Sequence, residues 1–271
     1  MTRAMMPAVL PPDLAIDTLR TIRALVTATG GRMRDMASEL RHATAKDGVD
    51  LVTAADTFCE RELSRALAAT FPAHRILAEE GTQLGDPASE WTWHLDPLDG
   101  TANYARGIPY WSVSLGLAWR QEPVLGIIHA PAYGITVFAA LGLGAWRDDQ
   151  PLPSATPAGD PGSWLVATDW PWKLEERSRT NRLLSALAPT IRQYKTCGSA
   201  ALDLAHLALG QVDAYAISHI FPWDQAAGAA IVRTLGYELR TWSGGAWDLT
   251  HPDIVACRPG MWPVLSAALS A

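Results

Sequence analysis

Apolar residues recur at helical spacing near the start of the chain, and this pattern predicts a long helix over residues 13–43. The pair Gly30-Gly31 lies inside this segment and is expected to be a weak point, because glycine lowers helix stability. A second helix is predicted over residues 57–70. Its start, Thr57–Glu60, has the spacing of a capping box, and Phe71-Pro72 ends it.

Short apolar runs separated by Gly and Pro turns follow the second helix, and such runs are typical of strands. We predict strands at residues 75–79, 91–96, 111–119, 123–130 and 135–140. With the preceding helices they form an α+β half, in which helices pack on a largely antiparallel sheet. The segment 147–163, rich in Asp, Pro, Ser and Gly, is the candidate subdomain boundary, so the predicted division is 1–146 and 147–271.

The second half alternates strands and helices, which is the order of an α/β unit. Extended segments are predicted at residues 164–168, 212–217, 237–241 and 253–256. Helices are predicted over 173–188, from Gly198-Ser199-Ala200 to Gly210, and over 224–235. The expected fold class of the whole chain is therefore α/β, with an α+β N-terminal half and an α/β C-terminal half.

Composition places the chain among globular proteins: of its 271 residues, 48% are hydrophobic and 18% are charged. A formal net charge of −6 provides no basic field for nucleic acid. No apolar run approaches the roughly 20 residues that span a bilayer, and the N-terminus lacks the features of a signal peptide. Three cysteines without metal-type spacing are expected to stay reduced, which favours a cytoplasmic location: Cys59, Cys197 and Cys257.

Several aromatic and polar residues are expected to be structural. The cysteines read as small buried hydrophobes, and Asp203 as a contact between a helix and a loop. The tryptophans and histidines of the predicted strands are expected in the core: Trp91, Trp93, Trp111, Trp119, His94 and His129.

The segment that ends the predicted strand 91–96 carries the strongest chemical signal. In Asp96-Pro97-Leu98-Asp99, a tight turn brings together two carboxylates and the backbone carbonyl of Leu98, and Mg²⁺ prefers oxygen donors of this kind. The following Gly100 and Thr101 offer backbone N–H groups and a hydroxyl that suit a phosphate. The same residues also suit an ordinary turn, because Pro fixes φ and Gly accepts positive φ.

Three further acids lie at the ends of predicted elements, and each has a structural explanation. Asp56 and Asp224 suit helix N-caps, and Glu79 suits an exposed strand end. Together with Asp96 and Asp99, however, they favour a site for two or three divalent cations, which would clamp the oxygens of a phosphoryl transfer. The predicted helix start at Gly198–Ala200 adds N–H groups that could meet an anion.

These motifs, taken in order, resemble the inositol monophosphatase family of Mg²⁺-dependent, lithium-sensitive phosphatases. The resemblance covers nearly the whole chain, from about Asp50 to Gly245, and implies a layered αβαβα sandwich assembled as a homodimer. The segments that carry it are Asp50–Asp56, Glu79-Glu80-Gly81, Asp96–Tyr104, Gly198–Ala205 and Pro222–Gly228.

The resemblance also implies a role for each site residue. Two Mg²⁺ ions, with a weaker third held by Glu79 largely through water, would be bound by oxygen donors: Glu79, Asp96, the carbonyl of Leu98, Asp99 and Asp224. Asp56 and Thr101 would orient and deprotonate the attacking water. The phosphate would be held by Gly100, Thr101, Gly198, Ser199 and Ala200. The implied reaction is hydrolysis of a small phosphorylated alcohol by metal-activated water.

Substrate selection is where the chain departs from the family pattern. In relatives that hydrolyse inositol phosphates, a glutamate lies seven residues before the aspartate matched by Asp224, and here that position is Ile217. His219 is a neighbouring polar group that could replace it. The tryptophans of Trp170-Pro171-Trp172 are either a packed loop or dimer contact, or an aromatic wall for a leaving group such as an imidazole, an aryl group or a base.

The sequence therefore leaves more than one function open. The main prediction is a phosphatase of the inositol monophosphatase type, and the alternative is a histidinol-phosphate phosphatase. Nucleotide 3′-phosphatase and fructose-1,6-bisphosphatase activities are less favoured, because no basic cluster is present for a second phosphate. From another class, a non-catalytic binding or regulatory protein is an alternative, although such a protein has no need of the complete acid set.

Overall fold

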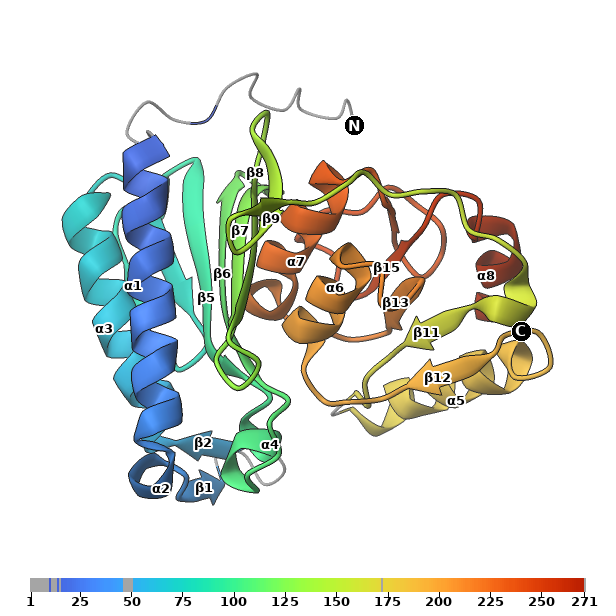
Figure 1. Ribbon diagram of the computed structural model, residues 1–271, viewed down its shortest axis with the longest axis horizontal. Coiled ribbons are helices and arrows are strands. Elements are labelled where there is room, and N and C mark those ends of the chain that lie inside the picture. Colours follow the sequence, from blue (N-terminus) through green and yellow to red (C-terminus); the bar gives the residue numbers. More distant parts are fainter. Residues whose placement is uncertain (1–9, 11–13, 15, 46–50, 172, 271) are drawn as a thin grey trace.

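The structure is a computed structural model that describes residues 10, 14, 16–45, 51–171 and 173–270. The chain folds into five layers (Figure 1). Helices α1 (Ile16–Asp35) and α3 (Ala54–Thr70) cover one face of an eight-stranded sheet, whose other face packs against α6 (Ala200–Ala208) and α7 (Pro222–Thr234). A five-stranded sheet and the helices α5 (Leu174–Leu187) and α8 (Trp262–Leu269) complete the αβαβα sandwich. The predicted fold class is confirmed.

Helix α1 runs through Gly30 and Gly31 without a break. A Cβ on Gly30 would lie 2.6 Å from Cδ2 of His129 on the sheet, which shows that this glycine permits close packing. The helix ends earlier than predicted. After the short α2 (Ala37–Leu40), the chain forms β1 (Ala43–Ala45), which pairs antiparallel with β2 (Leu51–Thr53).

Helix α3 begins at Ala54, three residues before the predicted start. Its cap is Thr53, whose Oγ1 accepts a hydrogen bond from the N–H of Ala55 at 3.1 Å. The side chain of Asp56 completes a capping box by accepting from the N–H of Thr53 at 2.7 Å. The capping box predicted at Thr57–Glu60 was therefore wrong, because Thr53 and Asp56 offer the same spacing closer to the preceding strand.

The large sheet has the strand order β10-β9-β8-β7-β6-β5-β3-β4, and it is antiparallel except where β3 lies parallel to β5. Strands β9 and β10, the last two of this sheet in chain order, lie at the predicted boundary near residue 147, where the sequence suggested a loop. The strands are β3 (Arg75–Ala78), β4 (Gln83–Leu84), β5 (Trp91–Asp99), β6 (Ser112–Trp119), β7 (Glu122–Ala130), β8 (Ile135–Ala140), β9 (Gly144–Arg147) and β10 (Gln150–Pro151).

The second sheet has the order β12-β11-β13-β15-β14. Strand β11 is parallel to both β12 and β13, whereas β15 is antiparallel to β13 and β14. The sequence did not predict β12 or α8. The strands are β11 (Leu165–Ala167), β12 (Gln193–Lys195), β13 (Ala214–Ile217), β14 (Glu238–Arg240) and β15 (Ile254–Cys257).

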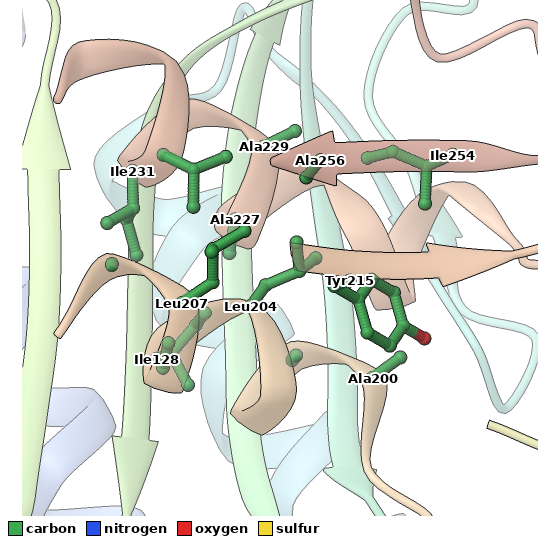
Figure 2. Packing of buried hydrophobic residues seen from close by; sticks show 14 of the residues in the cluster. Ile128, Ala200, Leu204, Leu207, Tyr215, Ala227, Ala229, Ile231, Ile254 and Ala256 are labelled. Atoms are coloured by element: carbon green, nitrogen blue, oxygen red, sulfur yellow. The ribbon is translucent and has the colours of Figure 1, made fainter. Parts of the chain in front are cut away.

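Helix α7 lies unusually close to the large sheet because glycines face it. Gly116 on β6 and Gly126 on β7 are register partners. A Cβ on Gly116 would lie 2.7 Å from Cβ of Ala226, and one on Gly126 would lie 2.1 Å from the carbonyl oxygen of Ala227. Figure 2 shows small residues of this helix, Ala227 and Ala229, beside α6, and both helices lie between the two sheets. This contact fixes the start of α7 relative to the large sheet.

Most of the expected core residues are buried. Trp93, Trp111, His94 and His129 are inaccessible, as are two of the three cysteines, whereas Cys197 is half-buried. Trp91 and Trp119 are partly exposed and face each other across β5 and β6. Within the described residues, no helix is long and apolar enough to cross a membrane.

Candidate active site

The predicted turn at Asp96–Asp99 is part of β5 and forms a β-bulge. Asp96 pairs with Ser114 and Asp99 with Ser112, so β5 carries one residue more than β6 between these pairs. The N–H of Leu98 donates to Oδ1 of Asp96 at 2.9 Å, which closes the bulge. A bulge bends a strand and re-aims its side chains, and both carboxylates line one cavity as a result.

Gly100 links β5 to the short helix α4 (Thr101–Ala105) with φ at +97°, a value that L side chains rarely adopt. A Cβ at this position would also lie 2.9 Å from the carbonyl oxygen of Tyr110 and 3.2 Å from that of Gly198. Glycine is therefore required here, both for backbone conformation and for the close approach of two other segments.

Asp56 and Thr101 are hydrogen-bonded, although they come from separate elements. Oγ1 of Thr101 lies 3.2 Å from Oδ1 of Asp56 and 2.9 Å from the carbonyl oxygen of Leu98. Asp56 is fully buried in the first turn of α3, and burial raises its pKa to about 6. The pair therefore joins a hydroxyl to a carboxyl group that takes up a proton close to neutral pH.

Asp99 is held by the start of α6. Its Oδ2 accepts from Oγ of Ser199 at 2.6 Å and from the N–H of Ala201 at 2.7 Å, and its Oδ1 accepts from the N–H of Ala200 at 3.2 Å. Burial raises the pKa of Asp99 to about 7, while these hydrogen bonds oppose the rise. The donors predicted for a phosphate at Ser199 and Ala200 are thus bonded to Asp99.

Asp224 lies in the first turn of α7, where its Oδ2 accepts from the N–H of Phe221 at 3.1 Å. Its neighbour Asp96 is buried, and burial raises the pKa of Asp96, as do the nearby charges of Glu79, Asp99 and Asp224. We call Glu79, Asp96, Asp99 and Asp224 the acid cluster. The structure brings these four predicted ligands together from β3, β5 and α7.

The acid cluster lines a cavity of about 400 Å³. The cavity also receives Leu98, Gly100, Thr101, Gly198 and Ala200, together with the predicted substrate-selecting residues Trp170, Ile217 and His219. Ser199 and Asp56 do not line it, but they contact Asp99 and Thr101, which do. Trp172 lies outside the described residues.

A second pair of acids lies beside this cavity, and the sequence did not assign it to the site. Oδ1 of Asp169 accepts from the N–H of Gly198 at 2.8 Å, and its Oδ2 accepts from the hydroxyl of Tyr215 at 3.1 Å. Asp203 accepts from the hydroxyl of Tyr110, so it contacts a loop as expected, but its buried Oδ2 has no donor. Burial and the charge of Asp169 raise the pKa of Asp203.

Comparison with known proteins identifies the architecture. A model of the inositol monophosphatase family matches residues 17–270. The chain belongs to this family. An inositol-1-monophosphatase of Synechocystis is 34% identical over 275 residues, which cover 100% of this chain and 94% of the relative. A Nus factor SuhB of Vibrio cholerae is 32% identical over 223 residues, covering 82% and 83% of the two chains. A solved inositol monophosphatase from Anabaena has 30% identity and a TM-score of 0.79, covering 93% of this chain and 96% of its own.

Inositol monophosphatase family members are phosphatases and are generally metal-dependent, so the acid cluster was tested for its fit to cations. In the part of the chain that the structure describes, no three Asp, Glu, His or Cys side chains already surround one metal position. The donor chemistry nevertheless fits, because all four side chains are carboxylates. Asp96 and Asp99 are buried with raised pKa values, and a cation would keep them ionised. Oδ1 of Asp99 accepts one hydrogen bond and keeps a second lone pair for coordination, whereas Oδ2 accepts two.

Proposed function

We propose that this protein is a Mg²⁺-dependent phosphatase that hydrolyses a small phosphate monoester. The observation that carries the proposal is the convergence of the acid cluster and the Asp56–Thr101 pair at one cavity. The printed names of relatives such as the Synechocystis inositol-1-monophosphatase support a phosphorylated alcohol as substrate. A homodimer and a cytoplasmic location stay predictions.

The residues proposed to hold two or three Mg²⁺ ions are the acid cluster and the carbonyl oxygen of Leu98. All of these ligands are hard oxygen donors, as Mg²⁺ prefers. When bound there, the ions would lower the pKa of a coordinated water and offset the negative charge of the phosphate. The N–H groups at the start of α6 donate to Asp99, and these hydrogen bonds favour the ionised form of that carboxylate.

Thr101 and Asp56 are proposed to orient the attacking water and remove its proton. The hydroxyl of Thr101 can accept from water while it donates to Asp56, and the pKa of about 6 suits Asp56 to receive the proton near neutral pH. The water oxygen forms a bond to phosphorus as the ester P–O bond breaks, and the leaving alcohol oxygen takes up a proton. The products are inorganic phosphate and the free alcohol.

We assign the phosphate to Gly100 and Thr101. The first N–H groups of a helix have no partner within it, and α4 begins at Thr101, which lines the cavity. The segment Gly198–Ala200, also predicted to hold phosphate, has a different role in this proposal. Its N–H groups and the hydroxyl of Ser199 are bonded to Asp169 and Asp99, so the segment positions those carboxylates.

Histidinol phosphate is the second candidate substrate, because Ile217 lines the cavity at the position where inositol-hydrolysing relatives carry a glutamate. The hydroxyls of inositol lose a partner there, at a cost of roughly 1–3 kcal/mol for each buried donor left unpaired. A regulatory protein is the alternative from another functional class, because a Nus factor SuhB is among the relatives. The complete acid set with the Asp56–Thr101 pair favours turnover.

Phosphate release measured on a panel of phosphate monoesters tests the proposal. The panel contains inositol 1-phosphate, histidinol phosphate and glycerol 2-phosphate, each with Mg²⁺, with Mg²⁺ and Li⁺, and with a chelator. We expect Mg²⁺-dependent release that Li⁺ inhibits. Absence of release from every ester at saturating Mg²⁺ contradicts the phosphatase proposal and favours a binding protein.

A further inference from the structure

One part of the cavity lining is aromatic and exposed. Trp170 and Phe221 are each 44% exposed, and both line the cavity that holds the acid cluster. Single exposed apolar residues are common, and seven large ones occur among the described residues. These two differ because they come from separate segments and meet at one cavity. We call Trp170, Phe221 and the half-buried His219 the aromatic rim.

The aromatic rim is held in place by contacts to its own neighbours. The ring of Phe221 stacks on Trp223, with centroids 5.1 Å apart, and the His219 ring meets Phe221 edge-on at 5.3 Å. On the other segment, Nε of Arg177 donates to the carbonyl oxygen of Pro171 at 2.9 Å, and the Arg177 guanidinium lies 5.9 Å from the Trp170 ring centroid. Rings that are already positioned lose little conformational entropy when a ligand binds.

The described lining near the rim provides few free hydrogen-bonding groups for a polyol. Ile217, Ile220 and Pro171 are buried and apolar. The Asn103 amide nitrogen already donates to the carbonyl oxygens of Tyr110 and Cys197, at 2.7 and 2.8 Å. His219 is the polar group within the rim, and burial and then the charge of Lys173 lower its pKa, which keeps the imidazole neutral.

We propose that the alcohol half of the substrate carries a planar aromatic or heteroaromatic ring, which stacks against Trp170 and Phe221 while the phosphate lies at the acid cluster. The inference rests on the proposed phosphatase function and names its substrate class. An aromatic pair contributes about 0.5–1.5 kcal/mol beyond the area that it buries, which corresponds to a preference of roughly 2- to 12-fold for each contact. Ring planarity, and not only hydrophobicity, therefore determines the preference.

Two matched esters separate planarity from hydrophobicity. Benzyl phosphate and cyclohexylmethyl phosphate have the same carbon skeleton and similar leaving alcohols, and glycerol 2-phosphate reports activity without a ring. We expect kcat/KM with Mg²⁺ to be about 5-fold or more higher for the benzyl than for the cyclohexylmethyl ester. Calorimetry with the corresponding phosphonates, which are not hydrolysed, is expected to show the same order of affinity.

Variants of the rim then locate the contact. Trp170→Leu and Phe221→Leu are expected to move the benzyl-to-cyclohexylmethyl ratio toward one, and this ratio does not depend on the fraction of folded enzyme. Tyr133→Leu is the matched control, because Tyr133 is 47% exposed but lies outside the cavity, and it should leave the ratio unchanged.

The outcomes distinguish this inference from the function on which it rests. Phosphate release with a wild-type ratio near one, or a ratio that neither rim variant changes, overturns the aromatic substrate class and leaves the phosphatase proposal standing. No release from these three esters overturns the aromatic substrate class, and no release from the inositol 1-phosphate and histidinol phosphate of the wider panel overturns the phosphatase proposal as well.

Discussion

The acid cluster and the aromatic rim line the same cavity but are built in opposite ways. Carboxylates of the cluster are tied to backbone N–H groups at the starts of helices and within the bulge of β5. The rim belongs to the segments after β11 and β13, and its two largest rings are exposed. The cluster has little freedom to vary because secondary structure depends on it, whereas the rim can change without loss of the fold. Reaction type and substrate choice are thus assigned to different parts of the chain.

The sharpest test of this division is Asp99→Asn. Loss of one charge from the acid cluster should lower kcat/KM about 100- to 1,000-fold, the usual effect of removing one electrostatic contact from a transition state. Because the proposed role of the cluster is to hold cations at the phosphate and not to contact the alcohol, benzyl and glycerol esters should lose the same factor. Asp86→Asn, at an exposed position between β4 and β5, is the control. An unchanged rate, or a loss of rate confined to one ester, contradicts the division of roles between the acid cluster and the aromatic rim.

Thr101 offers a second test through its hydroxyl. Thr101→Val keeps the shape of the side chain but removes the hydrogen bonds to Asp56 and to the Leu98 carbonyl oxygen. We expect kcat to fall about 100-fold or more, the typical contribution of a positioned proton-transfer group. Thr101→Ser should retain most activity because it keeps the hydroxyl. Equal rates for the two variants, measured by phosphate release, contradict the role of Thr101.

Stability without metal should depend on pH because Asp56, Asp96 and Asp99 are buried. Burial raises the pKa of Asp56 to about 6 and of Asp99 to about 7, and raises that of Asp96 well above its ordinary value. Unfolded carboxyls titrate near pH 3.9, so between about pH 4 and 7 the folded chain binds more protons than the unfolded chain. Metal-free stability should therefore fall as pH rises through this window, by roughly 1.4 kcal/mol per pH unit for each group.

Thermal unfolding with a chelator or with Mg²⁺ measures this effect. Because cations offset the charges that cause the loss, Mg²⁺ should raise Tm more at about pH 7.5 than at about pH 5. An equal Mg²⁺ effect at both pH values means that the ions bind away from the acid cluster.

The smallest expected effects concern the packing of α7, which holds Asp224, against the large sheet. Gly116→Ala places a Cβ 2.7 Å from Ala226 on α7 and should destabilise the fold by about 1–3 kcal/mol. Gly31→Ala is the matched substitution, since its Cβ meets nothing within 4 Å in the interior of α1, and it should stabilise by about 0.5–1 kcal/mol. Urea unfolding gives both values. Destabilisation of the same size by both substitutions contradicts the close approach of α7.

Local patterns predicted the longer elements well because these are strongly periodic. They failed at several short strands, among them β4, β9, β10 and β12, and at α8. Strand β12 has three residues without an apolar run, and α8 lies in the C-terminal segment where no cap marked its start. They also misplaced the start of α3. Two candidate capping boxes follow one another there, and only the β2–α3 connection decides between them.

The residues of the candidate site were predictable from the sequence, but the hydrogen bonds between them were not. The acids of the cluster were named from their positions at element ends, and they do line one cavity. Asp169 was not assigned to the site because it is linked to Gly198 through the parallel pairing of β11, a contact between segments far apart in the chain. The hydrogen bonds from the start of α6 to Asp99 are equally nonlocal. They occupy N–H donors that the motif alone assigns to phosphate.

The hydrogen bonds at the three helix starts change how relatives of this protein should be read. Asp56, Asp99 and Asp224 each satisfy N–H groups at the beginning of α3, α6 or α7, so a descendant that had lost turnover would still retain them in order to fold. Their presence in a sequence is therefore weak proof of activity. Thr101 is the more informative position, because its hydroxyl joins Asp56 to the cavity and its loss would mark a phosphatase scaffold that has been turned to another use.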